Sequence, residues 1–149
     1  MKTNKGPISV QQYHYDIADP DEEVKSEIQI ALEHPELHDE DGKKVEETDG
    51  RIYQVVVPFD IHPGNSPFKI SGMITQIVQL MDFHGHREDL TSKEVQQISR
   101  EAIEYIETIT YQVTAITLNH GVSLDFSAAD SLEPNQHVKD LQEKKNKKD

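Results

Sequence analysis

The only compact pair of histidines in the sequence is His84-Gly-His86, and the carboxylates of Asp82, Glu88 and Asp89 lie close to it in the chain. Imidazole and carboxylate groups are reasonable ligands for zinc or a similar ion. However, no second histidine pair as compact as this one occurs elsewhere, and the segment lies where a polar loop is expected before a helix. We therefore expect no metal and no cofactor. A metal-binding protein or an enzyme centred on His84 and His86 is kept as an alternative.

Patterns that carry common catalytic chemistry are absent from the sequence. It has no Walker loop and no GxGxxG turn, and none of its serines lies in a nucleophile elbow. Cysteine is also absent, which excludes disulfides and thiol chemistry. We therefore expect a protein that is not an enzyme, and we assign no catalytic residue.

The charge of the chain is strongly acidic and unevenly distributed. The 149 residues carry a formal net charge of −13, which argues against nucleic-acid binding. Most of the acidity lies in residues 19–49, and the plainer interpretation is a solvated loop. A docking surface for a basic partner is the alternative. No apolar run approaches the roughly 18 residues of a membrane span, so we expect a cytoplasmic protein that is not associated with a membrane.

One long amphipathic helix is the clearest element that the sequence predicts. Thr91 and Glu94 form a capping-box pattern, and Leu90 and Val95 flank it at the positions of a hydrophobic staple. Apolar residues then recur at helical spacing: Val95, Ile98, Ala102, Ile106, Ile109, Val113 and Ile116. We expect the helix to end near Gly121, and we expect Gly121 to adopt the left-handed backbone conformation that ends many helices. Because β-branched residues are common near its end, a strand over 110–118 is an alternative.

Four strands are expected before the helix, over residues 8–17, 24–33, 51–62 and 68–83, because apolar residues alternate there. Pro58 suggests an edge strand or a bulge, because proline lacks the N–H that a central strand needs. The simplest arrangement is an antiparallel meander, with the helix packed on one face of the sheet. The predicted fold is therefore an α+β, four-stranded antiparallel sheet with one long C-terminal helix.

The chain is expected to form one domain over residues 1–129, with a loose end at 1–6 and an acidic loop at 34–50. Residues 130–149 are polar and lysine-rich at the end, which predicts a flexible tail. After the helix, Val122, Leu124 and Phe126 alternate, and we expect this short extended segment to fold back onto the core.

The last predicted strand is apolar on both of its faces, which is more than one covering helix needs. Ile74 shares one face with the other even-numbered apolar residues, whereas Ile77, Met81 and Phe83 share the opposite face. The surplus apolar surface has three interpretations: core packing, an oligomer interface, or a groove for apolar segments. We take Ile74, Ile77, Met81 and Phe83 as the candidate apolar binding or oligomer surface.

The order of these elements resembles that of a known family. The run Tyr53-Gln-Val-Val-Val57, the apolar strand from Phe68 to Leu80, the long helix and the segment from Leu118 to Phe126 occur in the order of the SecB-like fold of bacterial export chaperones. Leu118, Val122, Asp125 and Phe126 match the stretch that follows the helix in that fold. More closely, the chain resembles uncharacterised SecB-like proteins of Gram-positive bacteria. The resemblance covers roughly residues 8–126.

SecB-type chaperones are acidic homotetramers that hold unfolded preproteins in apolar grooves and dock on a translocation motor through acidic residues of the sheet. The resemblance therefore implies a non-enzymatic binding protein that forms a homo-oligomer and holds apolar segments of unfolded polypeptides. The alternative to a chaperone is a structural or regulatory homo-oligomer that has no client groove.

Overall fold

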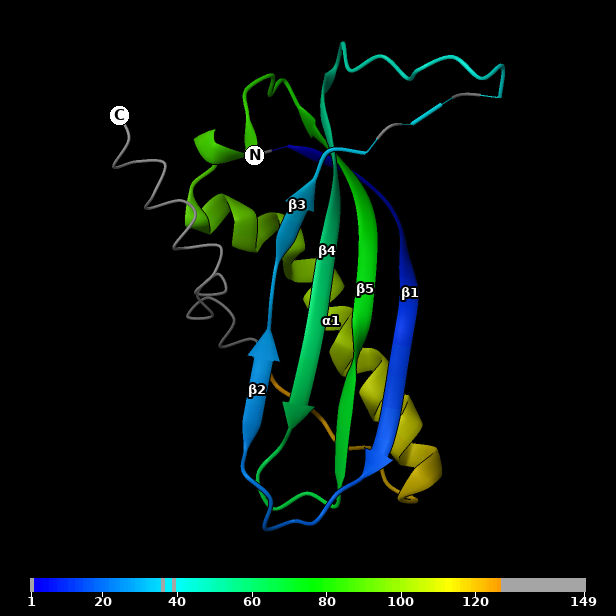
Figure 1. Cartoon of the computed structure of the whole chain (residues 1–149), viewed down its shortest axis with the longest axis vertical. Helices are drawn as coiled ribbons and strands as arrows, with labels where there is room; N and C mark the ends of the chain where they lie inside the picture. The colour runs from blue at the N-terminus through cyan, green and yellow to red at the C-terminus, as the bar shows by residue number, and fades with distance from the viewer. Residues whose placement is uncertain (1, 36, 39, 127–149) are drawn as a thin grey trace.

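A computed structural model describes residues 2–35, 37–38 and 40–126. It has two layers, an antiparallel sheet of five strands and one long helix that lies across one face of the sheet (Figure 1). This is the α+β arrangement that the sequence predicts. The elements are β1 (Thr3–Ile17), β2 (Lys25–Ile28), β3 (Ala31–Glu33), β4 (Gly50–His62), β5 (Phe68–Met81), the short 3-10 helix η1 (Arg87–Asp89) and α1 (Ser92–Thr117).

The strand order is β1-β5-β4-β2, with β3 also paired to β4, so the expected meander is wrong. β1 lies beside β5, and the chain then crosses the end of the sheet to reach β2 at the opposite edge (Figure 1). Two tyrosines of β1 pack against aromatic rings of the sheet. The ring centroid of Tyr13 lies 6.0 Å from that of Phe59 in β4, and the centroid of Tyr15 lies 5.8 Å from that of Phe68 in β5. β1 also begins at Thr3, so residues 3–6 are part of a strand and not a loose end.

The expected strand over 24–33 is divided into β2 and β3, which pair with β4 in one continuous register. The interruption lies opposite Pro58, which is therefore in a central strand and not on an edge strand. Its ring removes one ladder bond to the neighbouring strand, and the missing bond coincides with the gap between β2 and β3.

The hydrophobic core lies between the sheet and α1. Alternate residues of β4 and β5 point towards the helix, and most of their side chains are buried. On β1 the tyrosines that face the helix pack against the same core. The largest fully buried apolar side chains are Phe68, Ile70, Ile74, Leu80, Ile98, Ile106, Val55, Val57 and Val78.

The start of α1 confirms the capping box. Glu94 N–H donates to Thr91 Oγ1 over 3.1 Å, and Thr91 N–H donates to Glu94 Oε1 over 3.0 Å. Leu90 and Val95, the staple residues, are both buried in the core. The helix runs to Thr117, so the alternative strand over 110–118 is wrong.

The end of the helix differs from the expectation. Asn119 is the left-handed residue, with φ of 63°, and Gly121 has no positive φ. The ring of Tyr111, which is 50% exposed, packs over Gly121, so a Cβ atom at this position would displace the ring. The buried stripe also shifts near the end, because Thr110 and Thr114 are fully buried while Ile116 is 81% exposed.

The segment after α1 folds back onto the core, as expected. Val122 N–H donates to Thr114 Oγ1 over 2.7 Å, and Phe126 N–H donates to the Glu107 carboxylate. The Phe126 side chain is 9% exposed and belongs to the core. The predicted tail over 130–149 lies outside the described residues.

The segment between β3 and β4 contains the predicted acidic loop and projects from one end of the sheet (Figure 1). Glu47 anchors its return to β4, because its carboxylate accepts from Ile52 N–H over 2.7 Å and from His34 Nε2 over 2.9 Å. Although burial alone would raise the pKa of Glu47, these two bonds hold it below the usual value. The loop is therefore tied to the sheet at its base.

Candidate functional site

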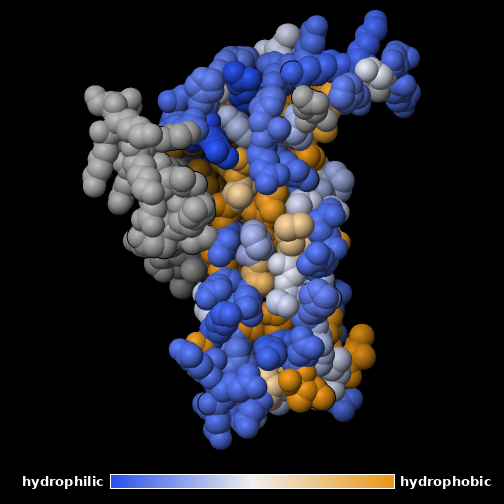
Figure 2. All heavy atoms as spheres, viewed as in Figure 1, coloured by the Kyte–Doolittle hydropathy of each residue, from blue (hydrophilic) through white to orange (hydrophobic). Residues whose placement is uncertain are grey.

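The face of the sheet opposite α1 is covered by no other element among the described residues. Figure 2 shows this face, on which apolar patches alternate with polar residues along the sheet. We name its central part the open-face strip. The strip consists of Ala31, Val56, Pro58, Met73 and Ile77. All five side chains are partly buried by their neighbours and partly accessible to solvent.

The strand register places the residues of the strip side by side. Pro58 is paired with Met73, Gln54 with Ile77, and Ala31 with Val56. Because paired residues on neighbouring strands point to the same face, these pairs form one continuous surface across β3, β4 and β5. Thr75, which is paired with Val56 and lies between Met73 and Ile77 on β5, is a polar residue within the strip, and its Oγ1 accepts from Gln11 Nε2 of β1 over 3.2 Å.

The end of the face near the β1–β2 turn is charged. Lys25 Nζ lies 2.7 Å from Asp60 Oδ2 and 3.9 Å from Glu27 Oε2, and these ion pairs are exposed. The bonded Asp60 carboxylate raises the pKa of Lys25. Exposed ion pairs contribute little to stability, so this margin matters mainly as a polar boundary of the strip.

The four sequence-predicted apolar residues lie in different places. Ile77 and Met81 are on the open face, where both are partly exposed. Ile74 is fully buried beneath the helix, as its even-numbered position implies. Phe83 packs against the hydrophobic core, because the left-handed backbone of Asp82 (φ of 61°) turns the chain after β5.

Sequence reasoning missed the contribution of the neighbouring strands to the surface. Val56 and Pro58 alternate with the buried residues of β4, so their spacing already placed them together on the second face. The missing information was the pairing of β4 with β5, which brings Pro58 next to Met73.

A second unpartnered feature is the outer edge of β1, since this strand pairs with β5 on one side only. Its register shifts between Lys5 and Ile8, where Pro7 lies, and again between Val10 and Gln12. Bulges and proline are common protections of an edge strand. The stretch from Gln12 to the exposed Ile17 is regular and open to pairing.

The candidate metal residues His84 and His86 line different pockets. His86 borders a pocket of about 270 Å³ with Tyr53 and Leu32, whereas His84 borders a wider hollow of about 720 Å³ beside Lys44. Within the described ranges, no group of three or more side chains is placed to hold a metal ion. The same part of the chain has no helix that is long and apolar enough to span a bilayer.

The sequence matches one family model over residues 1–126, and this model is described as a protein of unknown function, DUF1149. The chain belongs to this family. No curated protein matches it. Membership covers the whole described domain, including the sheet, the helix and the segment that folds back after it.

The solved structures that are similar to this DUF1149 protein include the following two. One is a protein of unknown function from Streptococcus agalactiae, with a TM-score of 0.65 and 22% identity, covering 85% of this chain and 98% of the other. The other is a SecB-like chaperone of Mycobacterium tuberculosis in complex with a ChAD peptide from the HigA1 antitoxin. It has a TM-score of 0.53 and 9% identity, and covers 83% of this chain and 89% of the other. The fold is therefore SecB-like, as the sequence resemblance implied.

Proposed function

We propose that this protein is a non-enzymatic, chaperone-like binding protein that holds apolar segments of unfolded polypeptides in the cytoplasm. The open-face strip is the observation that carries the proposal. It is a largely apolar, partly exposed surface across β3, β4 and β5, with the polar Thr75 among its residues and exposed ion pairs at one end of the face. An exposed apolar patch with a polar rim is typical of a site for protein binding.

The chemistry of the open face suits variable clients. Met73 of the strip and Met81, farther along the same face of β5, have flexible, polarizable side chains that adapt to different partners. Ile77 and Val56 add fixed apolar area, and burial of such area gains roughly 25 cal/mol per Å². The similar SecB-like chaperone is in complex with a peptide, which agrees with a polypeptide ligand for this fold.

The proposal is tested by aggregation of a chemically denatured client that is diluted into buffer with a stoichiometric amount of the protein. We expect the wild-type protein to suppress light scattering. A Met73→Gln/Ile77→Gln double variant is expected to suppress it several-fold less, because it removes apolar area from the strip. Ile116→Gln is the matched control, since Ile116 is 81% exposed on the helix and far from this face in the fold.

Two results would contradict the proposal. One is an absence of suppression with several unrelated clients, and the other is equal activity of the double variant and the wild type. Circular dichroism of each variant excludes loss of the fold as the cause of reduced activity.

A structural or regulatory homo-oligomer without a client is the second candidate, and the free edge of β1 favours it. Pairing of Gln12–Ile17 with a second copy would satisfy backbone groups that the edge leaves open, and it would cover Ile17, which is 85% exposed. Light scattering coupled to size exclusion measures the mass. This candidate would be supported over the first if the protein forms an oligomer that the Ile17→Lys substitution dissociates, and if the wild-type protein does not suppress client aggregation.

A further inference from the structure

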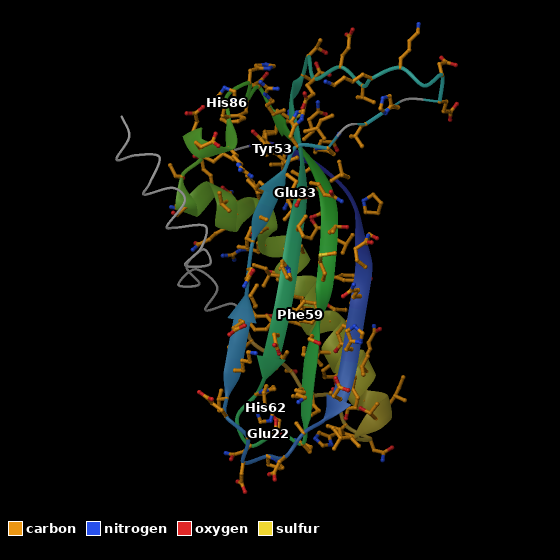
Figure 3. All side chains as sticks on the ribbon, viewed as in Figure 1. Glu22, Glu33, Tyr53, Phe59, His62 and His86 are labelled. Atoms are coloured by element: carbon orange, nitrogen blue, oxygen red, sulfur yellow. The ribbon has the colours of Figure 1, made fainter. Side chains whose placement is uncertain are left out.

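A small pocket lies at the end of the sheet from which the acidic loop projects. Its volume is about 270 Å³, and it is formed by β3, β4 and the segment that follows β5. Figure 3 labels Tyr53 and His86 at this end, well away from His62 at the other. The pocket is therefore separate from the charged margin of the open face.

The basic side chains of the pocket are unusual for this chain. The sequence has three arginines and twelve lysines. Arg51 and Arg87 both line the pocket, and no lysine does. Arginine presents a planar fork of donors that matches the two oxygens of a carboxylate, whereas lysine acts as a point charge. Two of three arginines thus converge on one cavity in a protein of net charge −13.

Both guanidinium groups are held by backbone carbonyls of neighbouring segments. Arg51 Nε donates to Gly85 O over 3.2 Å, and Arg87 Nη1 donates to Leu32 O over 2.9 Å. Each group is thereby oriented before any ligand arrives, which reduces the entropy cost of binding. The two anchors also join β3, β4 and the segment after β5 into one wall.

The charge of the lining defines the ligand charge. Arg51 and Arg87 contribute two positive charges, and Glu88, whose Oε1 lies 3.4 Å from Arg87 Nε, contributes one negative charge. Glu47 lies 3.6 Å from Arg51 but is also engaged by His34 and by the backbone. Because each arginine already has a carboxylate beside it, a ligand with one negative charge suits the pocket better than a ligand with two.

The remaining walls are apolar and aromatic. Tyr53 is 4% exposed, and the ring of His34 lies edge-on to it with 6.3 Å between ring centroids. Leu32 is also buried beside the cavity. At roughly 30 Å³ per water molecule, the volume equals about nine waters, or a ligand of on the order of ten non-hydrogen atoms.

We propose that this pocket binds a small monocarboxylate with an apolar body, its carboxylate between Arg51 and Arg87 and its body against Tyr53 and Leu32. The ligand is either a free carboxylic acid or the C-terminal residue of a peptide, since both have this chemistry. The inference does not rest on the open-face strip, so each is testable without the other.

Isothermal titration calorimetry with phenylacetate tests the site, and we expect a dissociation constant of about 1 mM or tighter. Neutral phenylacetamide and doubly charged phenyl phosphate are matched probes that are expected to bind more weakly. Arg87→Gln should weaken phenylacetate binding about tenfold or more, because it removes a charge-assisted bond. Arg100→Gln is the control, since Arg100 is the one arginine of the sequence that does not line the pocket.

A tripeptide that ends in phenylalanine separates the two sources of the carboxylate. Tighter binding of the free-acid tripeptide than of its amide identifies a chain terminus, whereas exclusion of both identifies a free acid. Three results would overturn the proposal. Phenylacetamide could bind as tightly as phenylacetate, phenyl phosphate could bind more tightly than phenylacetate, or the Arg87→Gln variant could bind phenylacetate as tightly as the wild type. Arg51→Gln gives a second measurement, and if circular dichroism shows that it is unfolded, Arg87→Gln decides.

Discussion

Gln29 donates its backbone N–H to the carbonyl oxygen of Pro58 over 3.0 Å, and Pro58 has no N–H to return. The two residues are opposite each other in the register that β2 and β3 share with β4. In an antiparallel sheet such a pair normally exchanges two bonds. The edge of the sheet is divided at the place where one of them is missing.

Pro58→Ala is expected to restore that bond and to join β2 to β3. The new bond contributes about 1 kcal/mol, but loss of proline frees the unfolded chain by about 0.4–1 kcal/mol. The free energy of unfolding should therefore change by less than about 1 kcal/mol. Hydrogen exchange of Pro58→Ala should show a protected amide at position 58. Pro20→Ala, in the exposed turn before β2, is the control, and its new amide at position 20 should exchange fast. A fast amide at position 58 would show that proline does not cause the gap.

His62 is expected to make stability depend on pH. Its two ring nitrogens lie 3.0 Å from the carbonyl oxygens of Glu23 and Ser66, and two acceptors can both be satisfied only by the doubly protonated ring. The bond to Glu23 O is the largest cause of the raised pKa of His62, opposed by burial. The bond to Ser66 O and the charge of Glu22 also raise it, and the charge of Lys69 lowers it.

Because the folded pKa of His62 lies above the unfolded value of about 6.5, the protonated ring favours the folded state. Its contribution is fully present below about pH 6.5 and is lost as pH rises through the folded pKa. Urea unfolding from pH 5.5 to 8.5 should show this fall in the wild type. His62→Gln should abolish it, and His86→Gln, at an exposed position, should retain it. If the free energy of unfolding of His62→Gln falls with pH as it does in the wild type, another titratable group causes the pH dependence.

Thr114 joins the helix to the segment that folds back after it, and Thr114→Val should loosen that segment. The hydroxyl is fully buried, accepts from Val122 N–H and donates to Thr110 O over 2.7 Å. An amide that loses its partner in this position costs about 1–3 kcal/mol. Thr117→Val is the control, because Thr117 is exposed and bonds only within its helix among the described contacts.

Urea unfolding measures the difference, with a change within about 0.5 kcal/mol expected for Thr117→Val. Hydrogen exchange at Val122 should also accelerate in Thr114→Val. Equal stability of the two variants would mean that the Glu107 bond and the core contacts of the segment hold it without Thr114.

The helix could be predicted from sequence because its signals are local. Thr91 and Glu94 are three residues apart, and the capping box that they form needs no information from the rest of the chain. The shift of the buried stripe to Thr114 was not predictable in the same way. It depends on Val122, whose N–H needs an acceptor only after the chain has turned back.

The sheet was predicted less completely, because strand pairing is a long-range property. The alternation of apolar and polar residues located the strands, but the residues of β1 do not indicate whether it pairs with β5 or with β2. Likewise, Phe83 continues the alternation of β5 in sequence, yet the left-handed Asp82 ends that alternation in space. The arginine pocket depends on the same kind of information, since Arg51 and Arg87 meet only through the fold.

Gly72→Ala should destabilise the protein, because β1 passes too close to this position for a side chain. A Cβ atom there would overlap the carbonyl oxygen of Gln12 and lie 3.0 Å from the Phe59 ring. The obstructing atom is backbone next to a β1 bulge, so it cannot move without shifting the strand. We expect a loss of about 1–3 kcal/mol. At Gly64 a Cβ would make ordinary contact, 3.4 Å from Val24, so Gly64→Ala should be neutral or stabilise by under about 1 kcal/mol. Urea unfolding of both variants checks this, and equal stabilities would mean that β1 can shift away from β5 at little cost.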